Sequence, residues 1–164
     1  MQKLLFFGVV FLLIFSCKPK NEGVVEDTVS TFEIDHKAWP KKMALDNKVK
    51  SALKDWKEFS ALEGSFDALY TVENTEDLSL VIEDLEVKQK AMAKSVFPKK
   101  FNLPQIKGRL TMFNTFLLKS KGDLYYRLDV QQSVLEMINA YNAMRNQFNI
   151  VVNNTLDTKL ILEE

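Results

Sequence analysis

Two residues carry the side chains that most often act as a nucleophile, a general base or a metal ligand. They are the chain's single cysteine, Cys17, and its single histidine, His36. Nucleophilic catalysis needs a nucleophile with a base beside it, and a structural zinc site needs about four Cys or His ligands. Asp35 and His36 are adjacent, but a solvated loop pair explains them better than a metal site does. We therefore expect no metal and no cofactor.

Pairs of acids offer a second kind of chemistry, because glycoside hydrolysis uses two carboxylates that flank the scissile bond. Glu83 and Asp84 are such a pair, but they fall on the flank of an expected helix and not in a cleft. The sequence has no phosphate-binding glycine loop and no dinucleotide fingerprint. Lys+Arg and Asp+Glu balance at 22 each, which gives no argument for nucleic acid as a partner. These features predict a protein that is not an enzyme.

Charged residues fall into three blocks along the chain. Residues 37–57 hold seven Lys against two Asp, residues 58–86 hold nine acids and no base, and residues 88–109 hold seven bases and no acid. A chain folded back near Asn74 places the two basic blocks together at one end, where the N-terminal tether is expected to enter. The acidic block then caps the opposite end.

The basic end suggests contact with a membrane, since a lysine near anionic head groups contributes about 1 kcal/mol. The alternative is a pair of solvated faces whose charge blocks are accidental. Helix polarity accounts for only part of the pattern, because lysines at the start of a helix oppose its macrodipole. The residues expected to face the membrane are Lys41, Lys42, Lys48, Lys50, Lys54, Lys99 and Lys100.

Asparagines recur at steps of three and four residues near the C-terminus, which places them on one stripe of a helix. Asn is a mediocre helix former, so such a stripe is unexpected. It could be a hydrogen-bonding face for a partner, or it could be a solvent face or a source of polar bonds between helices. The stripe comprises Asn139, Asn142, Asn146, Asn149 and Asn153.

Apolar residues recur at helical spacing from Pro40 onward, and Gly and Pro are few, at five and four. The first helix is expected at about 41–71. A second helix begins at Asn74, a capping residue followed by acids, and stops at Pro98. A third begins at Asn102, with Pro104 tolerated in its first turn, and ends near Gly122.

The fourth helix is expected to begin at Asp123 or Asp129. Four amphipathic helices with short connections predict an all-α fold, an antiparallel up-down-up-down four-helix bundle behind a flexible lipidated tether. Fusion of the third and fourth helices across Gly122 would leave three long helices instead. The expected divisions are 1–16 signal peptide, 17–39 tether, 40–153 helical bundle and 154–164 C-terminal tail.

The N-terminal segment carries Lys3 and then an unbroken apolar run from Leu4 to Phe15. That run is too short to span a bilayer, which takes roughly 20 apolar residues, but it suits the apolar region of a secretory signal. It ends in Ile14-Phe15-Ser16-Cys17, which resembles the lipobox of bacterial lipoproteins, although Phe15 is bulkier than usual there. The alternatives are an ordinary signal peptide with a chance cysteine, or a short buried helix.

The lipobox resemblance implies cleavage before Cys17 and attachment of a diacylglycerol to its sulfur, so that a fatty acid such as palmitate anchors the mature chain. The stretch from Gly108-Arg109-Leu110 through Ala140-Tyr141-Asn142 to Asn149 also resembles small helical lipoproteins of unassigned function in the Bacteroidota, which implies no activity.

Together these resemblances predict a lipid-anchored extracytoplasmic protein of the cell envelope. The outer membrane is favoured over the cell membrane as its location. Its partners would be the membrane and an envelope protein. Its expected role is non-enzymatic binding or envelope support, and the alternative is a periplasmic immunity or inhibitor lipoprotein.

Overall fold

The described part of the chain is all-helical, as the sequence predicts. The computed structural model describes residues 34–154, and these residues form helices and connections with no strand among them. Residues 1–16, Cys17, the expected tether up to residue 33 and the expected tail from residue 155 lie outside the described residues. No described helix is both long enough and apolar enough to cross a membrane.

Within residues 34–154, three short 3-10 helices accompany the α-helices. They are η1 (His36–Ala38), η2 (Leu69–Thr71) and η3 (Lys99–Phe101). The α-helices, in chain order, are α2 (Asn47–Leu53), α3 (Lys57–Ala68), α4 (Thr75–Lys94), α5 (Pro104–Tyr125) and α6 (Gln131–Asn153).

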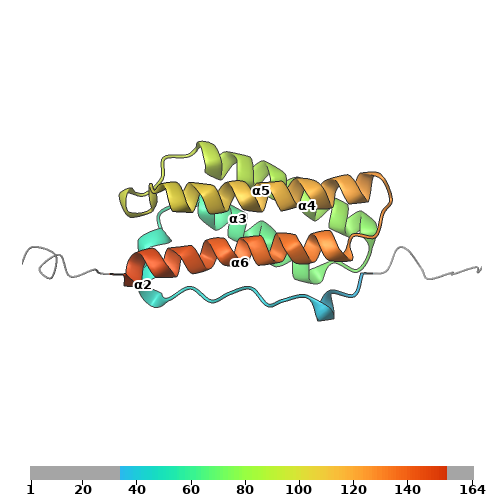
Figure 1. Ribbon diagram of the computed structural model, residues 1–164, viewed down its shortest axis with the longest axis horizontal. Coiled ribbons are helices and arrows are strands. Elements are labelled where there is room, and N and C mark those ends of the chain that lie inside the picture. The colour runs from blue at the N-terminus through green and yellow to red at the C-terminus, as the bar shows by residue number, and fades with distance from the viewer. Residues whose placement is uncertain (1–33, 155–164) are drawn as a thin grey trace, which may run out of the picture.

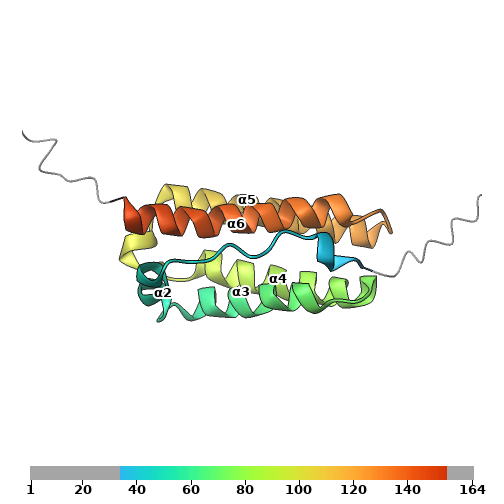
Figure 2. The same ribbon diagram turned by 90° about the horizontal axis from the view of Figure 1, so that it is seen from below.

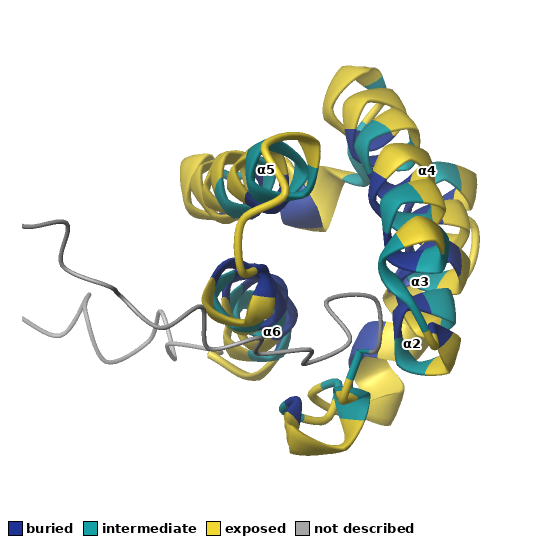
Figure 3. Cartoon of the chain, turned by 90° about the vertical axis from the view of Figure 1, so that its right-hand side faces the viewer, coloured by how far each residue is buried: buried dark blue, intermediate teal, exposed yellow. Residues whose placement is uncertain are grey.

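The long helices lie alongside one another, with α5 and α6 on one side of the body and α3 and α4 on the other (Figures 1 and 2). Residues 39–46, which we call the strap, run in extended form along α6 before α2 begins (Figure 2). Viewed from one end, the buried faces of the helices point toward the space between the two sides (Figure 3).

Aromatic side chains fill the middle of the core. Phe66 on α3 stacks on Tyr141 of α6 with ring centroids 3.6 Å apart, and Phe113 of α5 lies 5.1 Å from the same tyrosine. Nearer one end, Phe148 meets Phe101 at 5.0 Å. Each such ring contributes about 1.5–3 kcal/mol by leaving water, so these contacts hold α3, α5 and α6 in register.

The expected first helix, 41–71, is wrong at its start and in its middle. Residues 41–46 belong to the strap, because side chains of α6 bind their backbone groups. The helix also breaks after α2, where the amide of Trp56 donates to the carbonyl of Leu53 at 3.0 Å. The Trp56 indole N–H donates to Ser95 Oγ at 2.8 Å, and its ring lies 4.8 Å from that of Phe97. This burial of Trp56 explains why one periodic stretch forms two helices.

The second helix is confirmed. The Asn74 side chain accepts from the amide of Asp77 at 2.8 Å, so it caps α4 as expected. The third helix begins slightly later than Asn102, which lies in the turn after η3, and Pro104 occupies its first turn as predicted.

The third and fourth helices are separate, so the three-helix alternative is wrong. Gly122 does not end α5, which continues to Tyr125. The reversal comes at Arg127, whose φ of 54° is left-handed. Asp129 Oδ1 then accepts from the amide of Gln131 at 2.9 Å, and α6 begins there. Of the two predicted starts, Asp129 is the nearer one, two residues before the first residue of α6.

Candidate functional site

The asparagine stripe of α6 binds the chain's own strap. Asn142 Oδ1 accepts from the amide of Met43 at 2.8 Å, while its Nδ2 donates to the carbonyl of Lys41 at 3.0 Å. Asn149 repeats this pattern one step further along, at 3.0 Å to the amide of Asp46 and 3.0 Å to the carbonyl of Ala44. Each side-chain amide therefore satisfies one donor and one acceptor of the extended backbone.

The spacing of these two asparagines matches the spacing of the strap. Seven residues separate Asn142 from Asn149, a rise of about 10.5 Å along a helix. Three residues separate each backbone group bound by the first from its counterpart bound by the second, or about 10 Å of extended chain. Asparagines seven positions apart can thus bind an extended segment that runs parallel to α6, in register with it.

The other members of the stripe differ in their roles. Asn153 Nδ2 donates to the Asp46 side chain at the end of the strap. Asn139 and Asn146 are exposed, and within residues 34–154 their side chains have no hydrogen bond. The expected partner face, Asn139, Asn142, Asn146 and Asn149, is therefore not one free surface, because two of its four members are occupied by the strap.

A network of charged and phenolic groups lies under the strap. The Arg145 side chain is 5% exposed and pairs with Glu63 of α3, while its Nε donates to the carbonyl of Met43. The Tyr141 hydroxyl donates to the same glutamate. Lys42 completes the group, with Nζ 3.5 Å from Glu63 and a second pairing to Asp67. These contacts join the strap, α3 and α6.

The chemistry of this network is structural. Burial, followed by the charge of Glu63, raises the pKa of Tyr141 well above 10, so the phenol stays protonated and acts as a donor. The pKa of Tyr70 is also raised, chiefly by burial, and its hydroxyl donates to the carbonyl of Pro40 at 2.6 Å. Neither tyrosine is available as a base near neutral pH. Nothing in the local sequence pattern predicts this network, because its members come together only through the packing of the strap, α3 and α6.

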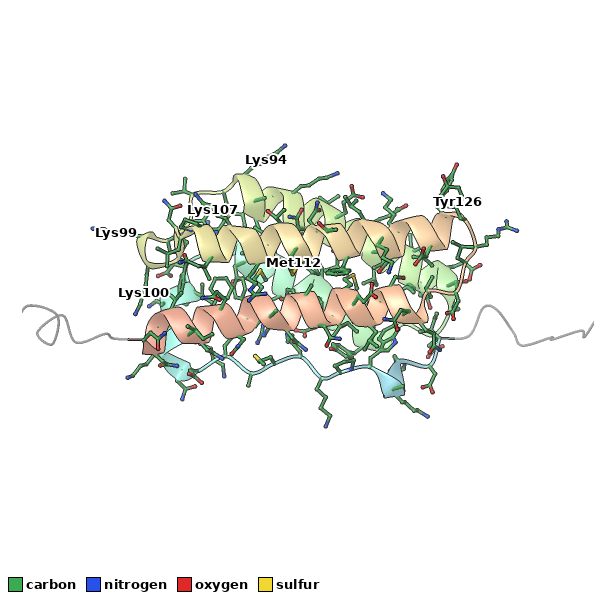
Figure 4. The ribbon with its side chains drawn as sticks, in the orientation of Figure 1. Lys94, Lys99, Lys100, Lys107, Met112 and Tyr126 are labelled. Carbon is green, nitrogen blue, oxygen red and sulfur yellow. The ribbon has the colours of Figure 1, made fainter. Side chains whose placement is uncertain are left out.

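Most of the predicted basic residues gather at one end of the body. Lys94, Lys99, Lys100 and Lys107 surround this end in Figure 4, around the connection between α4 and α5. The helix α2, which carries Lys48 and Lys50 and is followed directly by Lys54, lies at the same end (Figure 1). We call these seven residues the lysine end. All seven are exposed, and none forms an ion pair with an acid in residues 34–154.

Two of the expected members do not belong to the lysine end. Lys42 lies part-way along the strap and pairs with Glu63 and Asp67. Lys41 is exposed on the same strap, where its carbonyl is bound by Asn142. Both would lie at the end of the body only if the first helix began at residue 41.

The chain also enters the described body at the opposite end from the one expected. The amide of Ile34 donates to the carbonyl of Glu73 at 3.1 Å, just before α4. This acidic end, which holds Asp35, Glu73, Glu76 and Asp77, lies across the body from the lysine end (Figure 1). The strap runs along α6 from the acidic end to α2 at the lysine end. The sequence pattern does not reveal that the chain enters the body a full helix length away from α2. Two residues of the expected tether pack against the core, Ile34 and Trp39, and Trp39 is only 8% exposed.

The remaining candidate groups sit apart from one another. His36 Nδ1 is buried and has no hydrogen-bond partner among residues 34–154, and Asp35 accepts from the amide of Lys37 at 3.0 Å. Glu83 and Asp84 are exposed on α4, where Asp84 accepts from Ser65 and lies 3.4 Å from Lys88. No three metal-ligating side chains come together in the described part of the chain.

A pocket of about 510 Å³ opens at the acidic end, between the first turn of α4 and the connection from α5 to α6. Glu76 and Arg127 supply its charged lining, and Leu124 and Val130 its apolar lining. The exposed rings of Tyr125, the last residue of α5, and of Tyr126 after it lie at this end of the body (Figure 4 labels Tyr126). None of the residues singled out by the sequence lines the pocket.

The arrangement is therefore a helical body with a strap bound along one helix, an acidic end where the chain enters, and a lysine end opposite. The chain matches no protein-family model, and neither curated proteins nor solved structures provide a match to it.

Proposed function

We propose that the mature protein is a lipid-anchored, extracytoplasmic binding module of the bacterial envelope with no enzymatic activity. The observation that carries this proposal is the apolar run Leu4–Phe15 ending in the lipobox-like Ile14-Phe15-Ser16-Cys17. Lipid on Cys17 attaches a folded domain to a membrane without requiring a spanning helix. Two or more acyl chains make such an anchor stable, whereas one chain gives only marginal binding, on the order of 10⁴ M⁻¹.

The proposed domain is an up-down-up-down four-helix bundle, in which α2 and α3 together take the place of the first helix. The support for it is the alternation of direction along the chain, from α3 through α4 and α5 to α6 (Figure 1). The strap is an addition to that plan. It covers the side of α6 that faces α3, where Arg145 and Glu63 meet.

Binding is favoured over catalysis because the charged and phenolic groups under the strap are committed to holding the parts of the body together. Glu63 is engaged by Arg145, Tyr141 and Lys42 at once. Tyr141 remains protonated because its pKa is raised. Surface charges gather at the two ends of the body, and surfaces of that kind serve recognition. We place the protein on the outer membrane, with an envelope protein or surface as its partner.

Fractionation of cells with fatty-acid labelling tests the anchor. The wild-type protein should incorporate labelled palmitate and sediment with the envelope, and Cys17→Ser should lose both properties. Ser16→Ala is the matched control, since it keeps a small residue before the cysteine and should behave as the wild type. Unchanged labelling and sedimentation of Cys17→Ser would contradict the proposal.

A further inference from the structure

We infer that the lysine end docks on an anionic lipid surface other than the bilayer that holds the anchor. The inference rests on the proposed function, because only a lipid anchor on Cys17 defines one bilayer as the anchoring bilayer and the other as the docking surface. The chain reaches the body at the acidic end, by the bond from Ile34 to Glu73. A helix of the length of α6, 23 residues, spans about 35 Å. The lysine end therefore stands about one body length from the point where the chain enters.

The lysine end is assembled from segments far apart in the sequence. Trp56 joins them, because it follows α2 and donates to Ser95 at the end of α4. The Trp56 ring also packs on Phe97, and Lys107 Nζ of α5 lies 5.5 Å from the Phe97 ring centroid. Lysines from α2, from the connection after α4 and from α5 are thus held on one buried scaffold. A rigid group of cations of this kind raises the local potential more than scattered lysines would.

An apolar side chain lies among these cations. Val96 is 92% exposed, between Lys94 and Lys99 in the connection after α4. The neighbouring Phe97 is half-buried against Trp56, which fixes the backbone that carries the valine. An apolar tip flanked by lysines suits the boundary of a bilayer, where the tip leaves water and the cations meet head groups. A soluble polyanion would bind the lysines but would gain nothing from contact with Val96.

The opposite end of the body gives the docking its orientation. Asp35, Glu73, Glu76 and Asp77 gather where the chain enters. An anionic surface repels that end and attracts the other, so the long axis of the body turns its lysine end toward the surface. A body that the chain joins at its acidic end can present its lysine end to a second surface.

A vesicle-capture experiment with the full mature lipoprotein tests the inference. The protein is inserted by its acyl chains into phosphatidylcholine vesicles, and acceptor vesicles containing about 30% phosphatidylglycerol are added. We expect the two populations to associate at low salt and to separate as salt rises toward 0.5 M, because surface electrostatics are screened over about a Debye length. Co-flotation of the two vesicle dyes is the measurement.

Variants at the lysine end sharpen the test. Each lysine near an anionic surface contributes about fivefold in binding, so Lys99→Gln with Lys100→Gln should weaken capture about 25-fold. Lys37→Gln with Lys41→Gln removes the same charge from exposed positions away from that end, and should change capture less than about twofold. Val96→Ser should weaken capture about fivefold, since it removes the apolar tip without changing the charge of the lysine end.

The outcomes separate the inference from the proposed function. Failure of the protein to float with phosphatidylcholine vesicles alone would overturn the anchor. Flotation without capture of the anionic vesicles would overturn the inference and leave the anchor in place. Capture that is unaffected by Val96→Ser and is matched by binding to soluble polyglutamate would identify the ligand as a polyanion, and would also overturn the inference.

Discussion

Removing the two asparagines that read the strap should release it while leaving the helices folded. Asn142→Ala with Asn149→Ala deletes four side-chain bonds to the backbone of Lys41, Met43, Ala44 and Asp46. At about 0.5–1.5 kcal/mol each, these bonds contribute about 2–6 kcal/mol. Because both asparagines are only partly buried, we expect a loss in the lower part of that range, about 2–4 kcal/mol before any gain in helix propensity.

The same helix supplies a matched control. Asn139→Ala with Asn146→Ala makes the same chemical change at exposed positions of α6, so it brings the same gain in helix propensity, about 0.5 kcal/mol per site. Urea unfolding should therefore place the free energy of unfolding of the two double variants about 2–4 kcal/mol apart. Exchange of the Met43 and Asp46 amides should accelerate in the first double variant and stay unchanged in the control.

Two results would refute this reasoning. Equal free energies of unfolding for the two double variants would mean that the strap contributes nothing to the stability of the body. Unchanged exchange at Met43 and Asp46 in Asn142→Ala with Asn149→Ala would mean that the amides are protected by something other than these side chains.

Three further changes test the contacts inside the body. Arg145→Met leaves Glu63 without its buried partner and should lower the free energy of unfolding by about 2–3 kcal/mol, since the 20% exposure of Glu63 moderates the cost. A loss under about 0.5 kcal/mol in urea unfolding, which is the size expected of a surface substitution, would argue against the pair. Tyr141→Phe keeps the ring stack and removes only the donor to Glu63, so thermal unfolding should report a loss of about 1–2 kcal/mol, and an unchanged melting temperature would contradict the bond. Hydrogen bonds from Lys121 and Lys90 lower the pKa of Glu86 below its ordinary 4.5. The stabilising contribution of Glu86 is therefore complete above pH 4.5 and is lost as the pH falls through the lowered pKa. Glu86→Gln should flatten the fall in the free energy of unfolding below pH 4.5, and an acid-unfolding curve parallel to that of the wild type would contradict this.

Local signals in the sequence predicted the helices that are set by local chemistry. Asn74 caps α4 because its side chain reaches an amide three residues ahead, and Asp129 marks the start of α6 in the same local way. Gly122 led to a wrong prediction of the end of α5, because a glycine inside a helix resembles a C-terminal signal. The chain reversal itself depends on Arg127. The all-helical class followed from periodicity, which needs no knowledge of tertiary contacts.

The strap could not be predicted from local pattern. Leu45 and Val49 are spaced as in a helix, so residues 41–46 read as the beginning of one. Their backbone groups are taken instead by Asn142 and Asn149, about a hundred residues later in the chain. The asparagine stripe stood out as unusual in the sequence, but its partner was invisible there. The end at which the chain enters was misplaced for the same reason.

The most direct test of the central claim is mass spectrometry of the N-terminal peptide of the protein purified from its native envelope. We expect the first residue to be Cys17, with the mass of a diacylglyceryl thioether and, in most molecules, an acylated amine. A peptide that still contains Met1 through Ser16, or an unmodified Cys17, would contradict the claim that a lipid on this sulfur holds the helical body at a membrane.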